Sequence, residues 1–249
     1  MFSSNSSQVA DDKLFVEDVF STWLYTGING GNQTITNGID LAGKGGLVWA
    51  KSRGVAQNHW LTDTASGVAL NSNTTNAGSS YSGYFTPLSN GYTSGYGTTT
   101  NYTYASWTFR KAPKFFGVVT YTGNGAENRV LSHALGSVPG TMIIKRTDST
   151  GNWDVWHRAF SYYLGTAPSV FCMGRLEETT QFGYSEAQRL GAAPTSTSFT
   201  LGPNVNGAPL LNASGATYVA YLFAHDATSD GIIQCGSYTV PFGASSVVS

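Results

Sequence analysis

The stretch Thr217-Tyr218-Val219-Ala220-Tyr221-Leu222-Phe223 is dominated by aromatic, β-branched and other apolar residues. Such a run lacks helical periodicity and is typical of a β-strand. A related run, Tyr104-Ala105-Ser106-Trp107-Thr108-Phe109, lies 114 positions earlier. Asn-Gly and Gly-Gly steps separate runs of this kind, and such steps favour the tight turns that join antiparallel strands. The sequence therefore predicts an all-β protein, folded as an antiparallel sandwich or barrel.

Two other segments of the first part of the chain also recur. The segment Phe20–Gly27 recurs as Phe116–Gly123, so that Tyr121 lies 96 positions after Tyr25. The run that ends in Lys51 recurs in the run that contains Lys145, 94 positions later. At the same offset, 58–61 aligns with 152–155. Because the order of the segments is preserved, we interpret the repeat as an internal duplication and expect a sandwich built from two duplicated halves.

The repeats divide the chain into four parts. We expect an N-terminal arm at 1–17, a first β repeat at 18–113, a second β repeat at 114–228, and a closing strand with a C-terminal tail at 229–249. The last part begins like a third repeat and could close a sheet edge that the second repeat leaves open. The polar arm is either a tether that grips a neighbouring molecule or a frayed terminus.

Composition excludes several classes of protein. Only 11% of the residues are charged and the net charge is −1, so the chain lacks the basic stripe that binds nucleic acid. The 41% of hydrophobic residues argues against disorder. No stretch approaches the roughly 18 apolar residues of a membrane span, and the N-terminus resembles no signal peptide. We therefore expect Cys172 and Cys235 to be free thiols rather than a disulfide.

Motifs of catalysis are missing from the sequence. The chain has no nucleophile elbow, zinc-binding His-Glu-x-x-His motif or phosphate loop. Glu177 and Glu178 are adjacent and would point to opposite faces of a strand. Lys51 and Lys145 each close an apolar run, and we expect both to extend their ammonium groups to water. The four histidines, at 59, 133, 157 and 225, are too far apart in the sequence to suggest a metal site. We predict no enzyme activity, no metal and no cofactor.

Aromatic residues among small polar ones are the remaining candidates for a binding site. Tyrosine offers a flat contact area, and Ser, Gly and Asn offer adaptable hydrogen bonds, as in recognition loops. Packing in the core or against another subunit is the alternative role for these rings. The candidate ligand- or partner-binding residues are Tyr81, Tyr84, Tyr92, Tyr96, His59, Trp60 and Trp156.

Several segments resemble a domain that is common in tailed phages. The resemblance rests on Phe20–Gly27, Thr34–Trp49, Ala105–Pro113, Gly136–Gly140 and Tyr218–Asp226, and it covers about residues 15–238. The domain is similar to jelly-roll, concanavalin-like and laminin-G-like sandwiches, and virion tail and fibre proteins usually carry it. The resemblance implies a structural protein located in the virion, with other virion proteins as partners and no catalytic residues.

Two roles are compatible with this resemblance. One is a tail-associated adhesin or fibre component that attaches to a glycan or protein of the host surface. The alternative is a capsid decoration protein that cements the head by binding coat subunits. In either role we expect a homo-oligomer, and a trimer would match both a fibre and a capsid three-fold axis.

Overall fold

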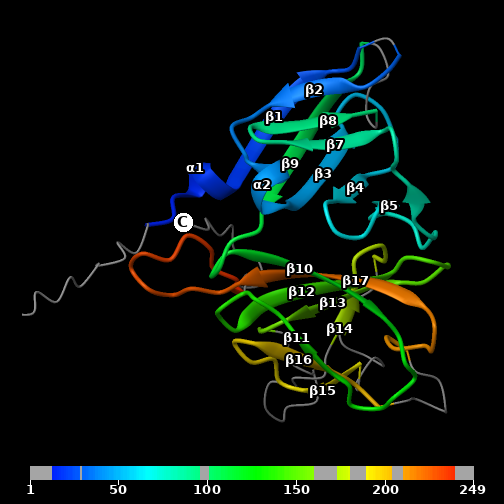
Figure 1. Ribbon diagram of the computed structural model, residues 1–249, viewed down its shortest axis with the longest axis vertical. Coiled ribbons are helices and arrows are strands. Elements are labelled where there is room, and N and C mark those ends of the chain that lie inside the picture. The colour runs from blue at the N-terminus through cyan, green and yellow to red at the C-terminus, as the bar shows by residue number, and fades with distance from the viewer. Residues whose placement is uncertain are drawn as a thin grey trace, which may run out of the picture.

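The computed structural model describes residues 13–28, 30–95, 101–159, 173–179, 189–203 and 210–238 (Figure 1). All strand pairs within these residues are antiparallel, and the two helices have four residues each. The predicted all-β class is therefore confirmed. The described residues include no helix that is long and apolar enough to cross a membrane.

The described residues of the first half form two helices and nine strands. They are α1 (Val16–Val19), β1 (Phe20–Thr26), β2 (Gln33–Thr36), α2 (Leu41–Lys44), β3 (Gly46–Ser52), β4 (Trp60–Asp63), β5 (Val68–Asn71), β6 (Ser79–Ser80), β7 (Phe85–Leu88), β8 (Gly91–Ser94) and β9 (Thr103–Arg110). A large sheet has the order β1-β9-β3-β4-β5-β6, and a small sheet has the order β2-β8-β7.

The second half repeats this topology. Its strands are β10 (Phe116–Thr122), β11 (Val130–Ser132), β12 (Pro139–Arg146), β13 (Trp153–His157), β14 (Met173–Arg175), β15 (Leu190–Ala192), β16 (Ser198–Leu201) and β17 (Thr217–Ala224). The large sheet has the order β10-β17-β12-β13-β14 and the small one the order β11-β16-β15. When β10 is matched to β1, β17 to β9 and β12 to β3, the two large sheets have the same strand order, except that, among the described residues, only the first one contains a sixth strand, β6. The two small sheets also share one strand order.

The strand registers also match. Phe20 pairs with Phe109 in the first half, and Phe116 pairs with Phe223 in the second, at the offsets of 96 and 114 found in the sequence. The offset of 94 likewise relates the pairing of β3 with β4 to that of β12 with β13. Since a slip of one residue would turn every side chain to the other face, equal registers mean that equivalent positions face the same way.

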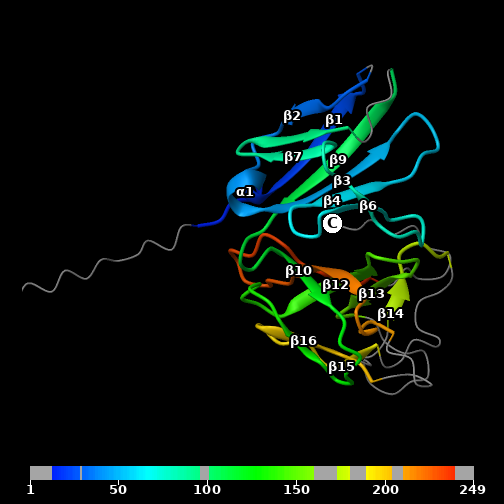
Figure 2. The ribbon, with the colours of Figure 1, turned by 45° about the vertical axis from the view of Figure 1, so that its right-hand side comes forward.

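The four sheets stack as four layers, with the two large sheets in the middle (Figures 1 and 2). Each small sheet covers the outer face of its own large sheet and encloses a core there. A third core lies between the two large sheets and contains residues such as Leu61, Ile143 and Trp153. The molecule is thus two sandwiches packed against each other. Its likeness to a jelly roll or to a concanavalin-like fold stays a prediction.

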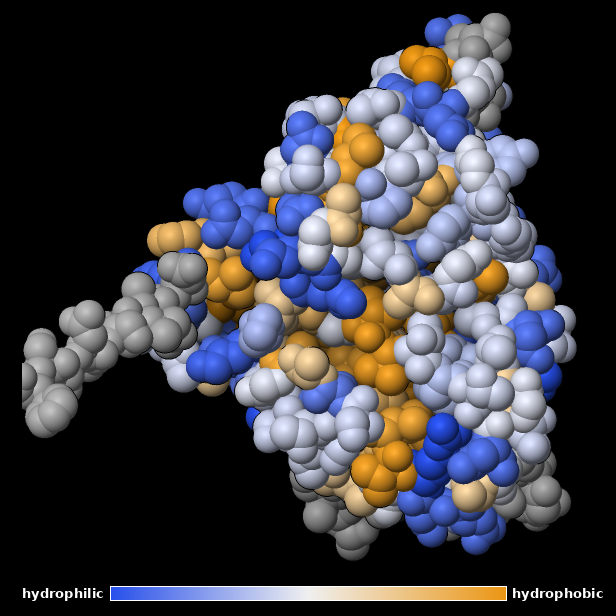
Figure 3. Space-filling model, in the orientation of Figure 1, coloured by the Kyte–Doolittle hydropathy of each residue, from blue (hydrophilic) through white to orange (hydrophobic). Residues whose placement is uncertain are grey.

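Burial on both faces explains the composition of the central strands. On β12, Met142 and Ile144 face the core under the small sheet, whereas Ile143 faces the core between the halves. Strand β17 alternates in the same way, with Leu222 on the first side and Tyr221 on the second. Figure 3 shows apolar side chains that remain visible where the two halves meet, within a mostly polar surface.

A buried hydrogen bond between two side chains joins the halves across the core between them. The Tyr221 hydroxyl donates to the Asp63 carboxylate at 2.8 Å, and both residues are completely buried. The same carboxylate accepts from Ser66 N–H and Ser66 Oγ, each at 2.7 Å. Such bonds satisfy a charge that would otherwise be costly to bury.

The second half also holds a loop of the first half. The Trp153 indole Nε1 donates to the carbonyl oxygens of Asn71 and Thr74, both at 3.0 Å. The Lys145 ammonium donates to the carbonyl oxygen of Thr75 at 3.3 Å and to that of Arg146 at 2.8 Å. We call this arrangement the clamp.

Both ends of the described chain depart from the expected boundaries. The arm was expected to extend to residue 17, but Leu14 packs against the core between the halves and Lys13 pairs with Asp230 at 3.0 Å. Residues 1–12 and 239–249 lie outside the described residues. No strand forms in 229–238, where a closing strand was expected. The chain turns back after β17 and buries Ile232 and Ile233 against the core instead.

We predict that Tyr221→Phe lowers the free energy of unfolding by about 1.5–3 kcal/mol, because Asp63 then loses a buried donor to its charge. Equilibrium unfolding in urea measures the change. Tyr25→Phe is the matched control, since the Tyr25 hydroxyl is buried with no hydrogen-bond partner among the described residues. A loss in Tyr25→Phe as large as in Tyr221→Phe would contradict the assigned role of the bond.

Candidate functional site

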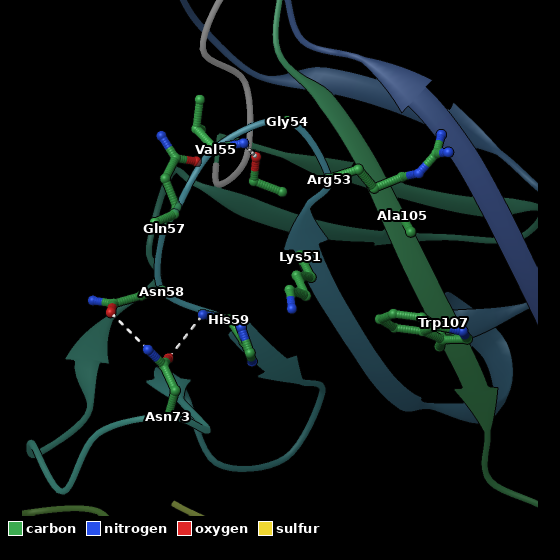
Figure 4. A pocket seen from close by; sticks show the side chains of 12 residues that line it. Lys51, Arg53, Gly54, Val55, Gln57, Asn58, His59, Asn73, Ala105 and Trp107 are labelled. Carbon is green, nitrogen blue, oxygen red and sulfur yellow. Dashed lines mark hydrogen bonds between the residues drawn. The ribbon is translucent and has the colours of Figure 1, made fainter.

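An open groove of about 990 Å³ lies on the face of the first half's large sheet that packs against the second half, on a part of it that the second half leaves uncovered (Figure 4). Lys51 at the end of β3, with Ala105 and Trp107 of β9, lines one side. The connection from β3 to β4, residues 53–59, and Asn73 line the other side. We call this site the groove.

Hydrogen bonds fix the shape of the groove's rim. The Asn73 side chain accepts from His59 N–H at 2.9 Å and donates to Asn58 Oδ1 at 3.1 Å. Arg53 N–H donates to the Thr103 carbonyl oxygen at 2.7 Å, and the Tyr104 hydroxyl donates to Gln57 Oε1 at 3.2 Å. The connection is therefore attached to the sheet and to the next loop, which preorganises the side chains that it carries.

Three side chains of different chemistry meet in the groove. The Lys51 side chain projects between the ring of His59 and the indole of Trp107 (Figure 4). Burial, and secondarily the charge of Lys51, lower the pKa of His59 below its ordinary value of 6.5. At neutral pH, His59 is therefore mainly uncharged. The indole of Trp107 meets that of Trp49 edge-on, at 6.4 Å between ring centroids.

This set of residues offers several kinds of contact to a ligand. Ammonium and amide groups can donate hydrogen bonds to oxygen acceptors, and an indole offers a flat apolar surface. Asp and Glu are missing from the described lining residues. Within the described part of the chain, no group of three or more His, Cys, Asp or Glu side chains could hold a metal ion.

The structure separates the residues that the sequence suggested for a binding site. Tyr92 lies in the core of the first half, where burial raises its pKa to about 12, and Trp156 lies in the core of the second. Placing these two at a binding surface was therefore wrong. Tyr81 is half-buried and packs edge-on against Phe85, at 5.4 Å between ring centroids.

The other suggested residues are at least partly exposed to solvent, apart from one that lies outside the described residues. Tyr84 is 54% exposed, just before β7. Trp60 is half-buried and faces away from the core between the halves, because its neighbour Leu61 faces that core. Tyr96 lies outside the described residues. Of the suggested residues that the structure describes, only His59 lines the groove.

Sequence reasoning missed the partners of His59. Lys51 was expected to extend to water, and it is exposed as predicted. Lys145 was expected to do the same, but it is completely buried in the clamp, where burial lowers its pKa to about 8. The offset of 94 that pairs these two lysines also pairs His59 with Trp153. This shared offset could have predicted that the groove and the clamp occupy equivalent places in the two halves. Cys172 lies outside the described residues, whereas Cys235 is a free thiol, as expected.

The fold and the groove define an all-β protein of two similar halves, with an open polar groove on the first half. Residues 16–247 match a family model described as a domain of unknown function, DUF7483, and the chain belongs to this family. A comparison with curated proteins found no match. A comparison with solved structures found none either.

We predict that Lys51→Met raises the pKa of His59 toward 6.5 without fully restoring it, since the effect of burial remains when the neighbouring charge is removed. The pH dependence of the His59 imidazole signals in NMR spectra measures this shift. Lys44→Met, on α2 and outside the groove, is the control and should leave the titration unchanged. If His59 titrates identically in all three proteins, Lys51 does not act on it.

Proposed function

We propose that this protein is a non-enzymatic structural protein of a tailed-phage virion and, within the particle, a tail-associated adhesin for host attachment. The groove carries the proposal: an indole surface, an ammonium group and side-chain amides converge there, held by a hydrogen-bonded rim. Sugars present both apolar ring faces and many oxygen acceptors, so a glycan of the host surface matches these groups. The resemblance of residues 15–238 to a domain of virion tail and fibre proteins supports the location.

The sparse charge of the surface supports a role in assembly. Only 11% of the residues are charged, compared with roughly 25% in an ordinary globular domain. Neighbouring virion proteins and further copies of this chain would then be partners, and we retain the trimer as the proposed assembly.

A capsid decoration protein is the second candidate, and one observation favours it. The clamp, which occupies the equivalent position in the second half, holds the main chain of a loop. In a decoration protein, the groove would hold a loop of a coat subunit in a similar way. Labelled imaging of the particle distinguishes the two, because an adhesin is found at the tail and a decoration protein at the head.

We predict that Trp107→Ala weakens binding of the purified protein to host cells about 10-fold or more, since an aromatic contact contributes about 0.5–1.5 kcal/mol beyond the area that it buries. A cell-binding isotherm measures the loss. Trp23→Ala is the matched control, because Trp23 is 40% exposed on β1 and does not line the groove. Thermal unfolding of both variants checks that the fold is kept. If a folded Trp107→Ala protein binds host cells as tightly as the unchanged protein, the groove is not the site that attaches to the host.

A further inference from the structure

The groove and the clamp occupy equivalent places on the two large sheets. Lys145 and Trp153 of the clamp lie 94 positions after Lys51 and His59 of the groove. In the clamp, the ammonium and the ring N–H donate to main-chain carbonyl oxygens of 71–75. In the clamp, where the loop at 71–75 covers this pair of positions, the two side chains therefore bind oxygen acceptors.

The two sites differ in a nearby carboxylate. Trp153 N–H donates to Glu177 Oε2 at 3.1 Å, and the equivalent N–H, of His59, donates to Asn73 Oδ1 at 2.9 Å. Asn73 thus takes the place of Glu177 and brings no charge. Burial lowers the pKa of Lys145, and the negative charges of Glu177 and Asp154 counteract this lowering.

The groove consequently has an excess of positive charge. Its lining includes Lys51 and Arg53, and the described lining residues contain no acidic side chain to balance them. The clamp thus has a carboxylate at Trp153 N–H, next to its lysine, whereas the lysine of the groove has no acidic neighbour among the described lining residues and is open to an external anion. Hydrogen bonds between an ammonium and a carboxylate are about twice as strong as those between neutral groups.

We propose that the groove selects carboxylated sugars, so that the ligand is an acidic, uronate-containing glycan. The carboxylate would pair with the Lys51 ammonium, the apolar face of the sugar would lie on Trp107, and amides of the rim would bind hydroxyl groups. The position of Lys51 between His59 and Trp107 places these contacts within one site (Figure 4). This inference rests on the proposed adhesin function and adds the chemical class of its ligand.

Calorimetric titration of the full chain with acidic oligosaccharides tests this selectivity. The probes are oligogalacturonate, oligoglucuronate and alginate oligomers, each compared with its carboxyl-reduced form of the same length and linkage. We expect at least one acidic oligomer to bind and its reduced form to bind 10-fold or more weakly. We also expect the affinity for the acidic form to fall between 50 and 500 mM salt, because screening weakens an exposed ion pair.

Two variants assign the selectivity to the groove. Asn73→Glu supplies the carboxylate that the clamp has, keeps an acceptor for His59 N–H, and should reduce the affinity for the acidic oligomer 10-fold or more. Lys51→Met keeps the length of the side chain, and its affinities for the acidic and reduced forms should become similar. Lys44→Met, which removes a positive charge outside the groove, is the control. Melting temperatures verify the fold of each variant.

The outcomes separate this inference from the proposed function. Equal or tighter binding of the reduced oligomers, or binding of none of the acidic ones, overturns the selectivity for carboxylates. If the protein still binds host cells, the adhesin role stands without that selectivity. If it binds neither cells nor oligosaccharides, both proposals fail. Preferential binding of an Asp- and Glu-rich peptide also overturns the glycan inference and points to a protein partner.

Discussion

Exclusion of water from the space between the two large sheets is the constraint on which the rest of the structure depends. Without it, Leu61, Ile143 and Trp153 would lie on solvent-exposed sheet faces. Burying the sheets face to face removes these side chains from water, and each such large apolar side chain contributes roughly 1.5–3 kcal/mol. The Asp63–Tyr221 bond and the clamp then fix how the halves meet, because both are directional.

The sequence repeat was sufficient to anticipate much of this architecture. Offsets of 94, 96 and 114 between repeated runs reappear as matching strand registers. The repeat does not indicate which face of each sheet is covered by the rest of the molecule. A strand that is buried on both sides has apolar residues throughout, so its pattern does not distinguish an inner from an outer face. The burial of Lys145, Tyr92 and Trp156 depends on this missing information.

The groove escaped sequence analysis for a related reason. Nothing in the local sequence distinguishes Lys51 from Lys145, since each ends an apolar run. Their environments differ because the loop at 71–75 covers the second lysine, and the described structure has no such loop over the first. The two halves thus carry two versions of one arrangement, of which one holds the halves together and the other is open. A binding function can arise in this way without any new fold.

The clamp also has a consequence for synthesis on the ribosome. The loop at 71–75 leaves the exit tunnel long before Trp153, which is 78 positions after Thr75. At a translation rate of about 5–20 residues per second, this loop waits roughly 4–16 s before Trp153 is synthesised. During this interval the apolar face around Leu61 and Leu70 is uncovered. A nascent chain of this protein is therefore most prone to misassembly at mid-length, and a chaperone that binds it would act before the second half emerges.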